Sequence, residues 1–493
     1  PEAGTPNVSV RLGVVALEDA SVRWLDTGDD PDVYLPRVGW FPDSRQLAVQ
    51  RQARDQQTLE LLRIDTRTDD SKLLLTERSD TWIRLHNELV FLKETPRFIW
   101  ASSRSGYKHL YLYDNDGTLI RPLSEGSWEV VHGSRRQNAV LHVNEQDGTV
   151  YVTGTFDSPL ERHVYALSLE GSRPPQRLTE LPGWHQATFA DSGEFYVDTF
   201  HSVSTPPQVS VHRNDGSRLA FIEENALDAS HPYYPYLASR PETRFGTLKA
   251  ADGQLLRYRL RTPADFDPAA RHPVVVIVYG GPGGGIVRNA WSAGFAEVLT
   301  ANGYVVFSLD NRGTGNRGVA FDAPIYRRLG HIEVADQIAG IEYLKSLDFV
   351  DPERIGMFGW SYGGYMVLMT MMQEPDAFAA GVSGAPVTDW ALYDTHYTER
   401  YMGTPQNNAE GYEAASTFPY VEQLDRPLLV MHGMADDNVL FTNSTKLFKA
   451  LQDSGKNFDV MAYPGSKHAL LRVPSTGRHG YAKILRFFDT HLK

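Results

Sequence analysis

The stretch Gly359-Trp360-Ser361-Tyr362-Gly363 has the pattern G-x-S-x-G and decides the fold class of the chain. The apolar run Ile355–Phe358 before it is typical of a buried strand, and Tyr362–Met372 after it is typical of a helix. The two glycines allow the strained strand-to-helix turn that exposes a serine hydroxyl at the carboxyl edge of a sheet. Because the short pattern also occurs by chance, this context is what identifies Ser361 as a candidate nucleophile.

The chain around this turn alternates between strand-like and helical segments. This alternation predicts a mostly parallel, doubly wound sheet with helices on both faces. The predicted strands are Val274–Tyr279, Tyr304–Leu309, Arg354–Gly359, Ala379–Ala385, Leu428–Gly433 and Asp459–Tyr463. The predicted helices are Glu333–Leu347, Tyr362–Met372, Thr442–Gln452 and Gly480–His491.

A serine nucleophile needs a general base, and the base needs an acid that orients it. In hydrolases with such a turn, the chain order is Ser, then Asp or Glu, then His. Asp436 follows the predicted strand Leu428–Gly433, and His468 lies in the loop after the strand that ends at Tyr463. Both side chains are therefore expected at the catalytic edge, and Ser361, Asp436 and His468 form the predicted triad.

Three other residues compete for these roles. Asp437 is the second candidate for the acid, and Asp436 is favoured. His432 ends a predicted strand but precedes the acid, which breaks the order, so bracing the loop is its favoured role. His479 lies near the start of the last predicted helix and is expected on the surface.

A glycine-rich loop, Tyr279-Gly280-Gly281-Pro282-Gly283-Gly284-Gly285, follows the first buried strand. A P-loop would end in Lys-Ser/Thr, which this loop lacks, and Pro282 and the missing downstream context argue against dinucleotide binding. The loop is better interpreted as part of an oxyanion hole. The hydroxyl of Tyr279 and the backbone amide of Tyr362 are its expected donors.

Residues 1–235 have a different pattern of short strands and turns. Asp-Gly pairs at 116–117, 147–148 and 215–216 indicate hairpins. This half suits about four to five propeller blades of ~50 residues, with an irregular β-sandwich as the alternative. A Pro-containing connector over 226–250 then separates the partial β-propeller, 1–235, from the catalytic domain, 236–493. The blade period rests on a strand-like sequence motif that recurs with starts about 45–54 residues apart. Its copies are Leu59–Asp65, Leu110–Asp114, Val164–Ser168 and Val209–Arg213.

The composition excludes several classes of function. A net charge of −13 argues against general nucleic-acid binding, which needs a basic face. The absence of cysteine excludes disulfide scaffolds, thiolate zinc sites and a cysteine nucleophile. No apolar run is long enough for a membrane span. The first residues, Pro1–Gly4, lack a starting Met and are not a signal peptide, which suggests a chain processed or truncated from a longer one.

Four aromatic residues, Trp390, Tyr393, Tyr397 and Tyr401, are spaced by 3, 4 and 4 positions. One buried helix face is the ordinary explanation for this spacing. The segment also follows the strand after the Ser361 helix, so it is expected beside the catalytic edge. An aromatic box there would suit a flat apolar ring such as proline.

Five motifs resemble those of the prolyl oligopeptidase family, and within it the dipeptidyl peptidase IV type. The resemblance is strong over about residues 245–493 and weaker back to Pro1. The motifs are Val278–Pro282, Asp310–Gly313, Gly359–Tyr365, Tyr397–Gly403 and His432–Val439.

The resemblance implies an α/β-hydrolase domain preceded by a β-propeller. It implies release of N-terminal dipeptides with proline, less often alanine, in the second position, by the same triad and oxyanion donors and without a metal or cofactor. It also implies a homodimer in contact through the C-terminal helix region, and a periplasmic or secreted location. The implied proline pocket consists of Tyr362, Val387, Trp390, Tyr393, Tyr397 and Val439, with Asn438 on a substrate carbonyl.

One departure from the family concerns the substrate's amino terminus. The family holds this amine with a pair of Glu residues that lies before the segment with which this chain starts. Glu223-Glu224 is the only late Glu pair in the propeller-like half, and it falls in the predicted connector. We therefore expect the numbering to start inside a longer protein. Pairing with another fragment, or loss of exopeptidase selectivity, are the alternatives.

Other functions remain open at this point. A tripeptidyl or acylaminoacyl peptidase of the same family would differ in how it holds the N-terminus. An esterase or lipase would prefer ester substrates and gain nothing from a proline ring. A peptide-binding propeller with an inert hydrolase domain is the non-catalytic alternative, and the complete triad argues against it.

Overall fold

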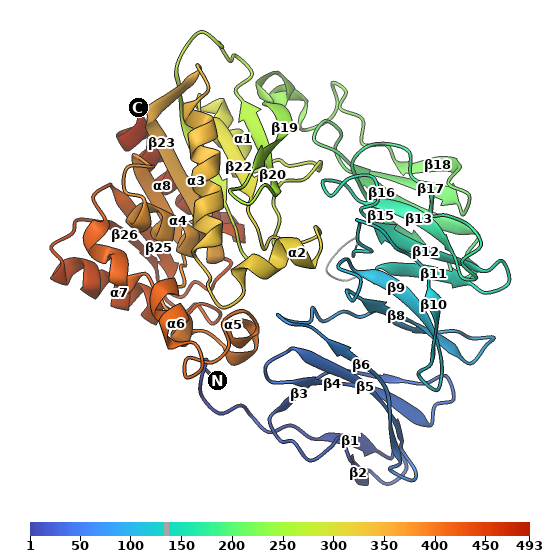
Figure 1. The fold of residues 1–493 in the computed structure, drawn as a ribbon. Helices are drawn as coiled ribbons and strands as arrows, with labels where there is room; N and C mark the ends of the chain where they lie inside the picture. The colour runs from blue at the N-terminus through green and yellow to red at the C-terminus, as the bar shows by residue number, and fades with distance from the viewer. Residues whose placement is uncertain (133–137) are drawn as a thin grey trace.

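The computed structural model describes residues 1–132 and 138–493. The N-terminal half forms a row of small β-sheets, and the C-terminal half forms a large sheet covered by helices; the two halves lie side by side (Figure 1). Among the described residues, the N-terminal half contains four antiparallel sheets of four strands and one sheet of two strands. This architecture confirms a propeller-like half followed by an α/β half.

Each four-stranded sheet is built from consecutive strands, as in a propeller blade. The two-stranded sheet is β1 (Leu12–Val15) and β2 (Val22–Leu25). The others are β3 (Val33–Trp40), β4 (Gln46–Ala53), β5 (Thr58–Asp65) and β6 (Ser71–Arg78); β7 (Leu89–Phe91), β8 (Arg97–Ser102), β9 (His109–Asp114) and β10 (Leu119–Pro122); β11 (Val140–Asn144), β12 (Thr149–Gly154), β13 (His163–Ser168) and β14 (Gln176–Arg177); and β15 (Trp184–Phe189), β16 (Phe195–His201), β17 (Gln208–Arg213) and β18 (Arg218–Glu223).

The recurring strand-like motif of the sequence forms the third strand of each four-stranded sheet: β5, β9, β13 and β17. The Asp-Gly turns connect strands as predicted, and Gly117, Gly148 and Gly216 have φ of 89°, 61° and 94°. Positive φ is what such turns require and what glycine tolerates. The irregular β-sandwich was therefore the wrong alternative.

The predicted connector, 226–250, is too long at its C-terminal end, and the Glu223-Glu224 pair lies before it. Glu223 ends strand β18 and does not lie in a connector, and Glu224 follows it directly; both side chains are exposed. Residues 242–249 form β19, an edge strand of the large sheet. Charged side chains on the open face of this edge strand, Glu242 and Arg244 among them, hid its strand character.

The large sheet has eight strands and is mostly parallel, as predicted. β19 and β20 are antiparallel to their neighbours, and the six strands from β21 onward run parallel to one another. The strand order is β19 (Glu242–Lys249), β20 (Leu255–Thr262), β22 (Val305–Asp310), β21 (His272–Val278), β23 (Val350–Trp360), β24 (Ala380–Gly384), β25 (Leu428–Gly433) and β26 (Asp459–Tyr463).

Helices cover both faces of this sheet, and the four predicted helices are present. The last one begins at Pro474, six residues before the predicted start, because proline is favoured in a first helical turn. The helices are α1 (Phe295–Ala301), α2 (Val319–Asp322), α3 (Ile332–Lys345), α4 (Tyr362–Gln373), α5 (Thr395–Met402), α6 (Ala409–Ala415), α7 (Thr442–Asp453) and α8 (Pro474–Leu492). The short 3-10 helices are η1 (Tyr234–Ser239), η2 (Ala323–Ile325), η3 (Trp390–Leu392), η4 (Phe418–Gln423) and η5 (Leu470–Arg472).

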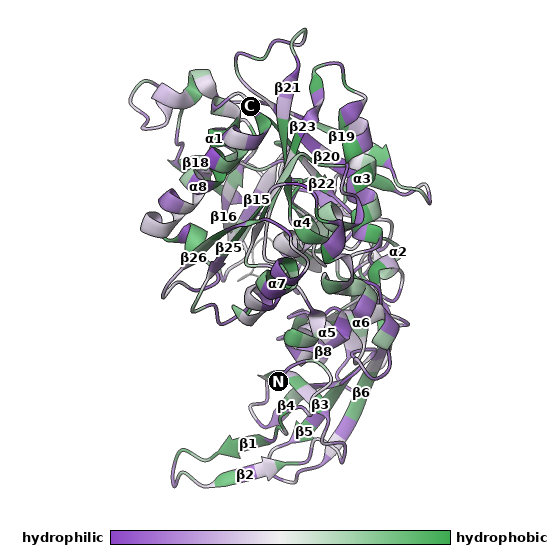
Figure 2. Cartoon of the chain, turned by 90° about the vertical axis from the view of Figure 1, so that its left-hand side faces the viewer, coloured by the Kyte–Doolittle hydropathy of each residue, from purple (hydrophilic) through white to green (hydrophobic). Residues whose placement is uncertain are grey.

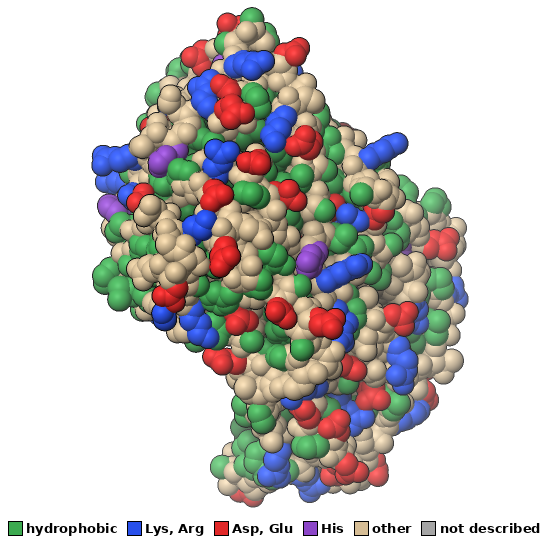
Figure 3. Space-filling view, turned by 60° about the vertical axis from the view of Figure 1, so that its left-hand side comes forward, with side chains coloured by type: hydrophobic (Ala, Val, Ile, Leu, Met, Phe, Trp, Pro, Cys, Tyr) green, Lys and Arg blue, Asp and Glu red, His purple; other side chains and the backbone are tan. Residues whose placement is uncertain are grey.

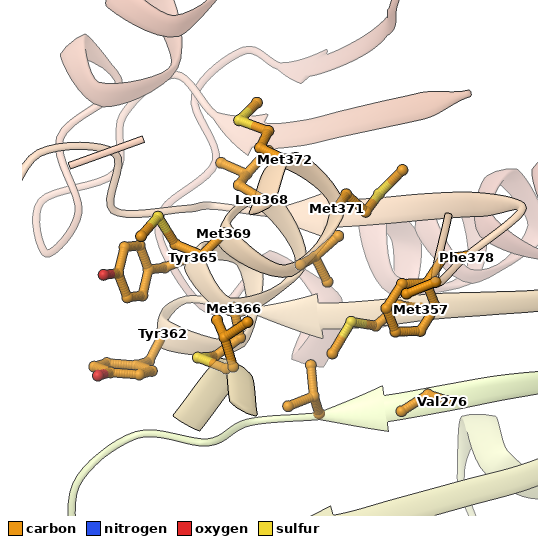
Figure 4. Close-up of a cluster of buried hydrophobic side chains, with 14 of the residues drawn as sticks. Val276, Met357, Tyr362, Tyr365, Met366, Leu368, Met369, Met371, Met372 and Phe378 are labelled. Atoms are coloured by element: carbon orange, nitrogen blue, oxygen red, sulfur yellow. The ribbon is translucent and has the colours of Figure 1, made fainter. Parts of the chain in front are cut away.

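Helix α4, which follows Ser361, is the centre of the core. All its residues from Tyr362 to Met372 are buried, and its Met and Tyr side chains belong to one buried hydrophobic cluster with Val276 of β21 and Met357 of β23 (Figure 4). A helix that is apolar on every side is stable only inside a protein. Helix α7, at the surface, instead carries both hydrophilic and hydrophobic residues (Figure 2). The start of α4, and with it Ser361, is therefore held rigidly.

The face of the molecule shown in Figure 3 carries acidic and basic side chains interspersed with apolar ones. Within residues 1–132 and 138–493, no helix has the length and apolar character that a membrane crossing needs.

Candidate active site

Ser361 lies on the sharp turn between β23 and α4, with φ 63° and ψ −121°. A non-glycine residue adopts such angles only where its surroundings hold it there. Ser361 N donates to Gly384 O at 2.8 Å, which fixes the turn to the next strand. A Cβ on Gly359 would lie 2.2 Å from Gly363 O, and one on Gly363 would lie 2.4 Å from Val278 O. On both sides of Ser361 the backbone is therefore packed too closely for any side chain, so both positions require glycine.

Asp436 and His468, predicted from chain order, are in direct contact. Nδ1 of His468 lies 2.7 Å from Oδ2 of Asp436. The other carboxylate oxygen accepts the amides of Asn438 and Val439 at 2.9 and 3.0 Å. Burial alone would raise the pKa of Asp436, but its hydrogen bonds outweigh burial and hold the pKa well below its usual range. The carboxylate is thus ionised and fixes the proton of His468 on Nδ1, which leaves Nε2 as the basic nitrogen.

The competing residues have other partners. Asp437 is exposed and pairs with Lys467 at 2.5 Å. His432 is buried, contacts Asp436 at 3.2 Å and also bonds Val439 O at 2.9 Å and Ser444 Oγ at 2.7 Å, so it braces the loop that carries the acid. His479 lies on α8 and is exposed.

The glycine-rich loop is held in place by the chain after β22. Asp310 accepts the amides of Ile286 and Val287 at 2.7 and 3.2 Å, and burial raises the pKa of this carboxyl to about 6. Asn311 Nδ2 donates to Gly280 O at 3.0 Å. The ring of Tyr279 lies against the loop backbone, since a Cβ on Gly284 would be 2.1 Å from its Cε1. The Asp310–Gly313 motif therefore shapes the loop that presents Tyr279, a role that sequence reasoning did not assign.

The predicted pocket residues come together around Trp390. The Trp390 ring stacks on the Tyr397 ring, with 6.0 Å between the two ring centroids. It is tilted relative to the Tyr362 ring, whose centroid lies 5.4 Å from its own. Val387 and Val439 are almost fully buried. Tyr393 Oη donates to Asn438 Oδ1 at 3.0 Å, which joins the aromatic segment to the acid loop. Trp390 belongs to η3 and Tyr397 to α5, so the explanation by one helix face is wrong: tertiary contacts, not a single helix, assemble the cluster.

Sequence reasoning missed Glu333, a fully buried carboxyl at the start of α3. Tyr362 Oη donates to its Oε1 at 2.7 Å, and the Gly330 amide donates to both oxygens at 3.1–3.2 Å. Burial raises the pKa of Glu333 to about 7. The residue orients the side chain whose backbone amide is an expected oxyanion donor. The only sequence signal was a Glu at the first position of a predicted helix.

Helix α5 is anchored on the first four-stranded sheet. Arg54 Nε and Nη2 donate to both carboxylate oxygens of the buried Glu399 at 2.7 and 2.8 Å. Gln56 donates to His396 O at 2.6 Å and accepts from Arg400 at 2.7 Å. The propeller half therefore contacts the helix that carries Tyr397. Among the described side chains, no group of three His, Asp or Glu could hold a metal ion.

Comparison with known proteins matches both halves. The prolyl oligopeptidase family model covers residues 291–493, and the model of the dipeptidyl peptidase IV N-terminal region covers 1–207. The crystal structure of Porphyromonas gingivalis dipeptidyl peptidase 4 is 32% identical with a TM-score of 0.92, covering 100% of this chain and 68% of that one. The chain belongs to the prolyl oligopeptidase family.

Curated relatives named as dipeptidyl peptidases or dipeptidyl-aminopeptidases are similar over most of this chain. Human dipeptidyl peptidase 8 is 31% identical over 100% of the chain and 62% of its own length. Probable dipeptidyl-aminopeptidase B of Emericella nidulans is 33% identical over 95% of the chain and 53% of its own length. The chain thus spans between about half and two thirds of the length of these relatives.

Proposed function

We propose that this chain carries the catalytic machinery of a serine dipeptidyl peptidase that releases N-terminal dipeptides with proline, less often alanine, in second position. The observation that carries the proposal is the Asp436–His468 contact, with His468 tied through Trp360 to the strained turn that holds Ser361. Relatives named as dipeptidyl peptidases support the reaction class. The aromatic group around Trp390 supports a flat, apolar residue before the scissile bond.

The reaction is acyl transfer. Ser361 Oγ attacks the carbonyl carbon of the substrate's proline residue, at the scissile peptide bond, and Nε2 of His468 takes the hydroxyl proton. Asp436 orients the imidazole and stabilises its positive charge. The Tyr279 hydroxyl and the Tyr362 amide stabilise the oxyanion, and each such donor contributes about 3–4 kcal/mol. His468 then protonates the leaving amine, and water hydrolyses the acyl-enzyme to free the dipeptide.

The pocket is the basis of specificity. Tyr362, Val387, Trp390, Tyr393, Tyr397 and Val439 are proposed to enclose the proline ring, and Asn438 to donate to a substrate carbonyl. Burial of apolar area around a ring that lacks an N–H favours proline over polar residues. We further propose that the active form is a homodimer in contact through the C-terminal helix region. A molar mass of twice 55.3 kDa, measured by light scattering of the protein in solution, would support the dimer.

The test compares Gly-Pro-p-nitroanilide with its N-succinyl form and with a tripeptidyl Ala-Ala-Pro form, using Ser361→Ala as the inactive control. Cleavage of the free-amine dipeptide substrate alone supports a dipeptidyl peptidase. Preference for the tripeptide or the blocked substrate would instead indicate a tripeptidyl or acylaminoacyl peptidase. Cleavage of simple esters without a proline preference would indicate an esterase. No cleavage, together with no fluorophosphonate labelling of Ser361, would overturn the catalytic proposal.

A further inference from the structure

A cavity of about 840 Å³ lies between the propeller sheets and the α/β half, beside the glycine-rich loop. Its wall contains six basic side chains, and Glu129 is the one carboxylate among the described residues that line it. This is an unusual balance in a chain with a net charge of −13. The basic residues are Arg84, Lys108, Arg162, Arg259, Arg288 and Arg400. We call this cavity the basic chamber.

Three of the six basic side chains are already engaged within the protein. Arg84 forms an ion pair with the buried Asp322. Arg400 donates to Gln56 Oε1 at 2.7 Å and contacts His396. Arg288 donates from Nε and Nη2 to Gly285 O at 2.9 and 2.5 Å. Any ligand chemistry of the basic chamber must therefore come mainly from the other three.

Arg162 is the most informative of these three. It is only 5% exposed, and its Nη1 donates to the backbone oxygen of Glu161 at 2.8 Å. Its Nε is buried without a hydrogen-bond acceptor in the part of the chain that the structure describes, and no carboxylate there forms an ion pair with it. Its guanidinium lies 4.5 Å from the Trp184 ring centroid, and that of Arg288 lies 5.2 Å from the same centroid. Burial and the neighbouring Arg288 lower the pKa of Arg162 to about 9.

Arg259 and Lys108 are two further cations in the wall of the basic chamber, one from each half of the protein. Arg259 comes from β20 of the large sheet, and Lys108 precedes β9 of the propeller half. Among residues 1–132 and 138–493, neither side chain has a hydrogen-bond or ion-pair partner. Burial and Arg261 lower the pKa of Arg259 to about 9, although the negative charges of Asp310 and Glu297 counteract part of this shift. Lys108 acts on the buried Glu88, whose pKa it helps to lower. Enclosed cations of this kind are stabilised by an anionic ligand.

The basic chamber also adjoins the candidate active site. Gly284, in its wall, lies directly against the ring of Tyr279. Tyr401, also in its wall, packs on Tyr397 with 5.1 Å between ring centroids. A peptide bound at Ser361 would therefore have the basic chamber within reach of its other residues.

We propose that the basic chamber binds a carboxylate of the peptide substrate, from an acidic side chain or from the C-terminus, mainly through Arg162 and Arg259. Guanidinium groups bind carboxylates through paired, charge-assisted hydrogen bonds, and an enclosed site strengthens them. The inference rests on the proposed peptidase function and adds a preference for acidic substrates to it.

The experiment measures kcat/KM for matched substrates that differ only in charge. One pair is Asp-Pro- against Asn-Pro-p-nitroanilide, a second is Gly-Pro-Gly-Gly-Glu-amide against its Gln form, and a third is Gly-Pro-Gly-Gly with a free or an amidated C-terminus. At least one acidic member should be cleaved about 10-fold better than its neutral match. Added salt should reduce this ratio. The pair that responds identifies the source of the carboxylate.

Arg162→Gln and Arg259→Gln should reduce that ratio to about 1, while Arg162→Lys should keep part of it. The matched control is Arg244→Gln, an exposed arginine of β19 that pairs with Glu242. Because the ratio is taken within one variant, changes in folding or in the chemical step cancel. Ratios near 1 in the wild type, or ratios that persist in both Gln variants, would overturn the proposal. Inhibition by inorganic phosphate without any substrate preference would indicate a free-anion site and also overturn it. Failure to cleave Gly-Pro-p-nitroanilide would instead refute the peptidase function.

Discussion

Trp360 donates a hydrogen bond from its indole Nε1 to the carbonyl oxygen of His468, at 3.0 Å. The residue before the candidate nucleophile thus holds the loop that carries the candidate base, although 108 positions separate them in the chain. The candidate nucleophile and the candidate base are therefore linked by this hydrogen bond, in addition to the contact of His468 with Asp436.

Trp360→Phe should lower kcat about 3- to 10-fold and leave KM within 2-fold. The ring is kept, but a hydrogen bond worth about 1 kcal/mol is lost, and the loop of His468 becomes less well placed. Steady-state kinetics on Gly-Pro-p-nitroanilide measure the effect, and Trp40→Phe, on an exposed tryptophan of β3, is the control. An unchanged kcat would show that the loop is held without Trp360.

Asp436→Asn should lower kcat by about 10⁴-fold, because the imidazole loses the carboxylate that fixes its tautomer. The neighbouring Asp437→Asn should change kcat less than 2-fold, since Asp437 only pairs with Lys467 at the surface. Both variants are compared by kcat on the same substrate. Equal losses in the two variants would contradict the assignment of the acid.

Tyr279→Phe should lower kcat about 100- to 1000-fold with little change in KM. The variant keeps the ring that lies on Gly284 and removes only the proposed oxyanion donor. Tyr236→Phe, on an exposed tyrosine of η1, serves as control. A loss below 3-fold would show that the hydroxyl does not donate to the oxyanion.

Gly363→Ala should destabilise the protein by more than about 2 kcal/mol, because its Cβ would lie 2.4 Å from Val278 O, a backbone atom of a buried strand. Gly39→Ala, in strand β3, has nothing within 4 Å of its added Cβ and should be tolerated. Thermal unfolding of the two variants gives the comparison. A Gly363→Ala protein as stable as the wild type would mean that the turn can shift.

Glu333→Gln should change how stability depends on pH. Burial raises the pKa of Glu333 from 4.5 to about 7 in the folded state. Between these values the unfolded chain has lost the proton that the folded chain keeps, so the contribution of Glu333 to stability falls as pH rises and levels off above about 7. Glutamine does not titrate. The Tm of the variant minus that of the wild type should therefore rise from pH 4.5 to 7. Glu342→Gln, exposed on the same helix, is the control, and a constant or falling difference for Glu333→Gln would contradict the prediction.

Much of the α/β half was predictable because its signals are local. Apolar runs and helical periodicity located β21 to β26 and four helices to within a few residues, except for the start of α8. Chain order favoured His468 over His432, but it did not separate Asp436 from Asp437; only the structure shows that Asp436 contacts His468 while Asp437 pairs with Lys467. The edge strand β19 was missed because its open face is polar, and an edge strand buries only one side.

The sequence by itself determined the strand–turn–helix around Ser361, since glycine spacing and residue pattern act through neighbouring dihedral angles and short-range contacts. It also determined the blade repeat, because each sheet forms within about 50 residues. Only the tertiary structure decided which distant side chains meet. The Glu333–Tyr362 bond, the Trp360–His468 bond and the basic chamber all join elements from different parts of the chain. Such contacts depend on strand order and on how the two halves dock, and no local pattern encodes either.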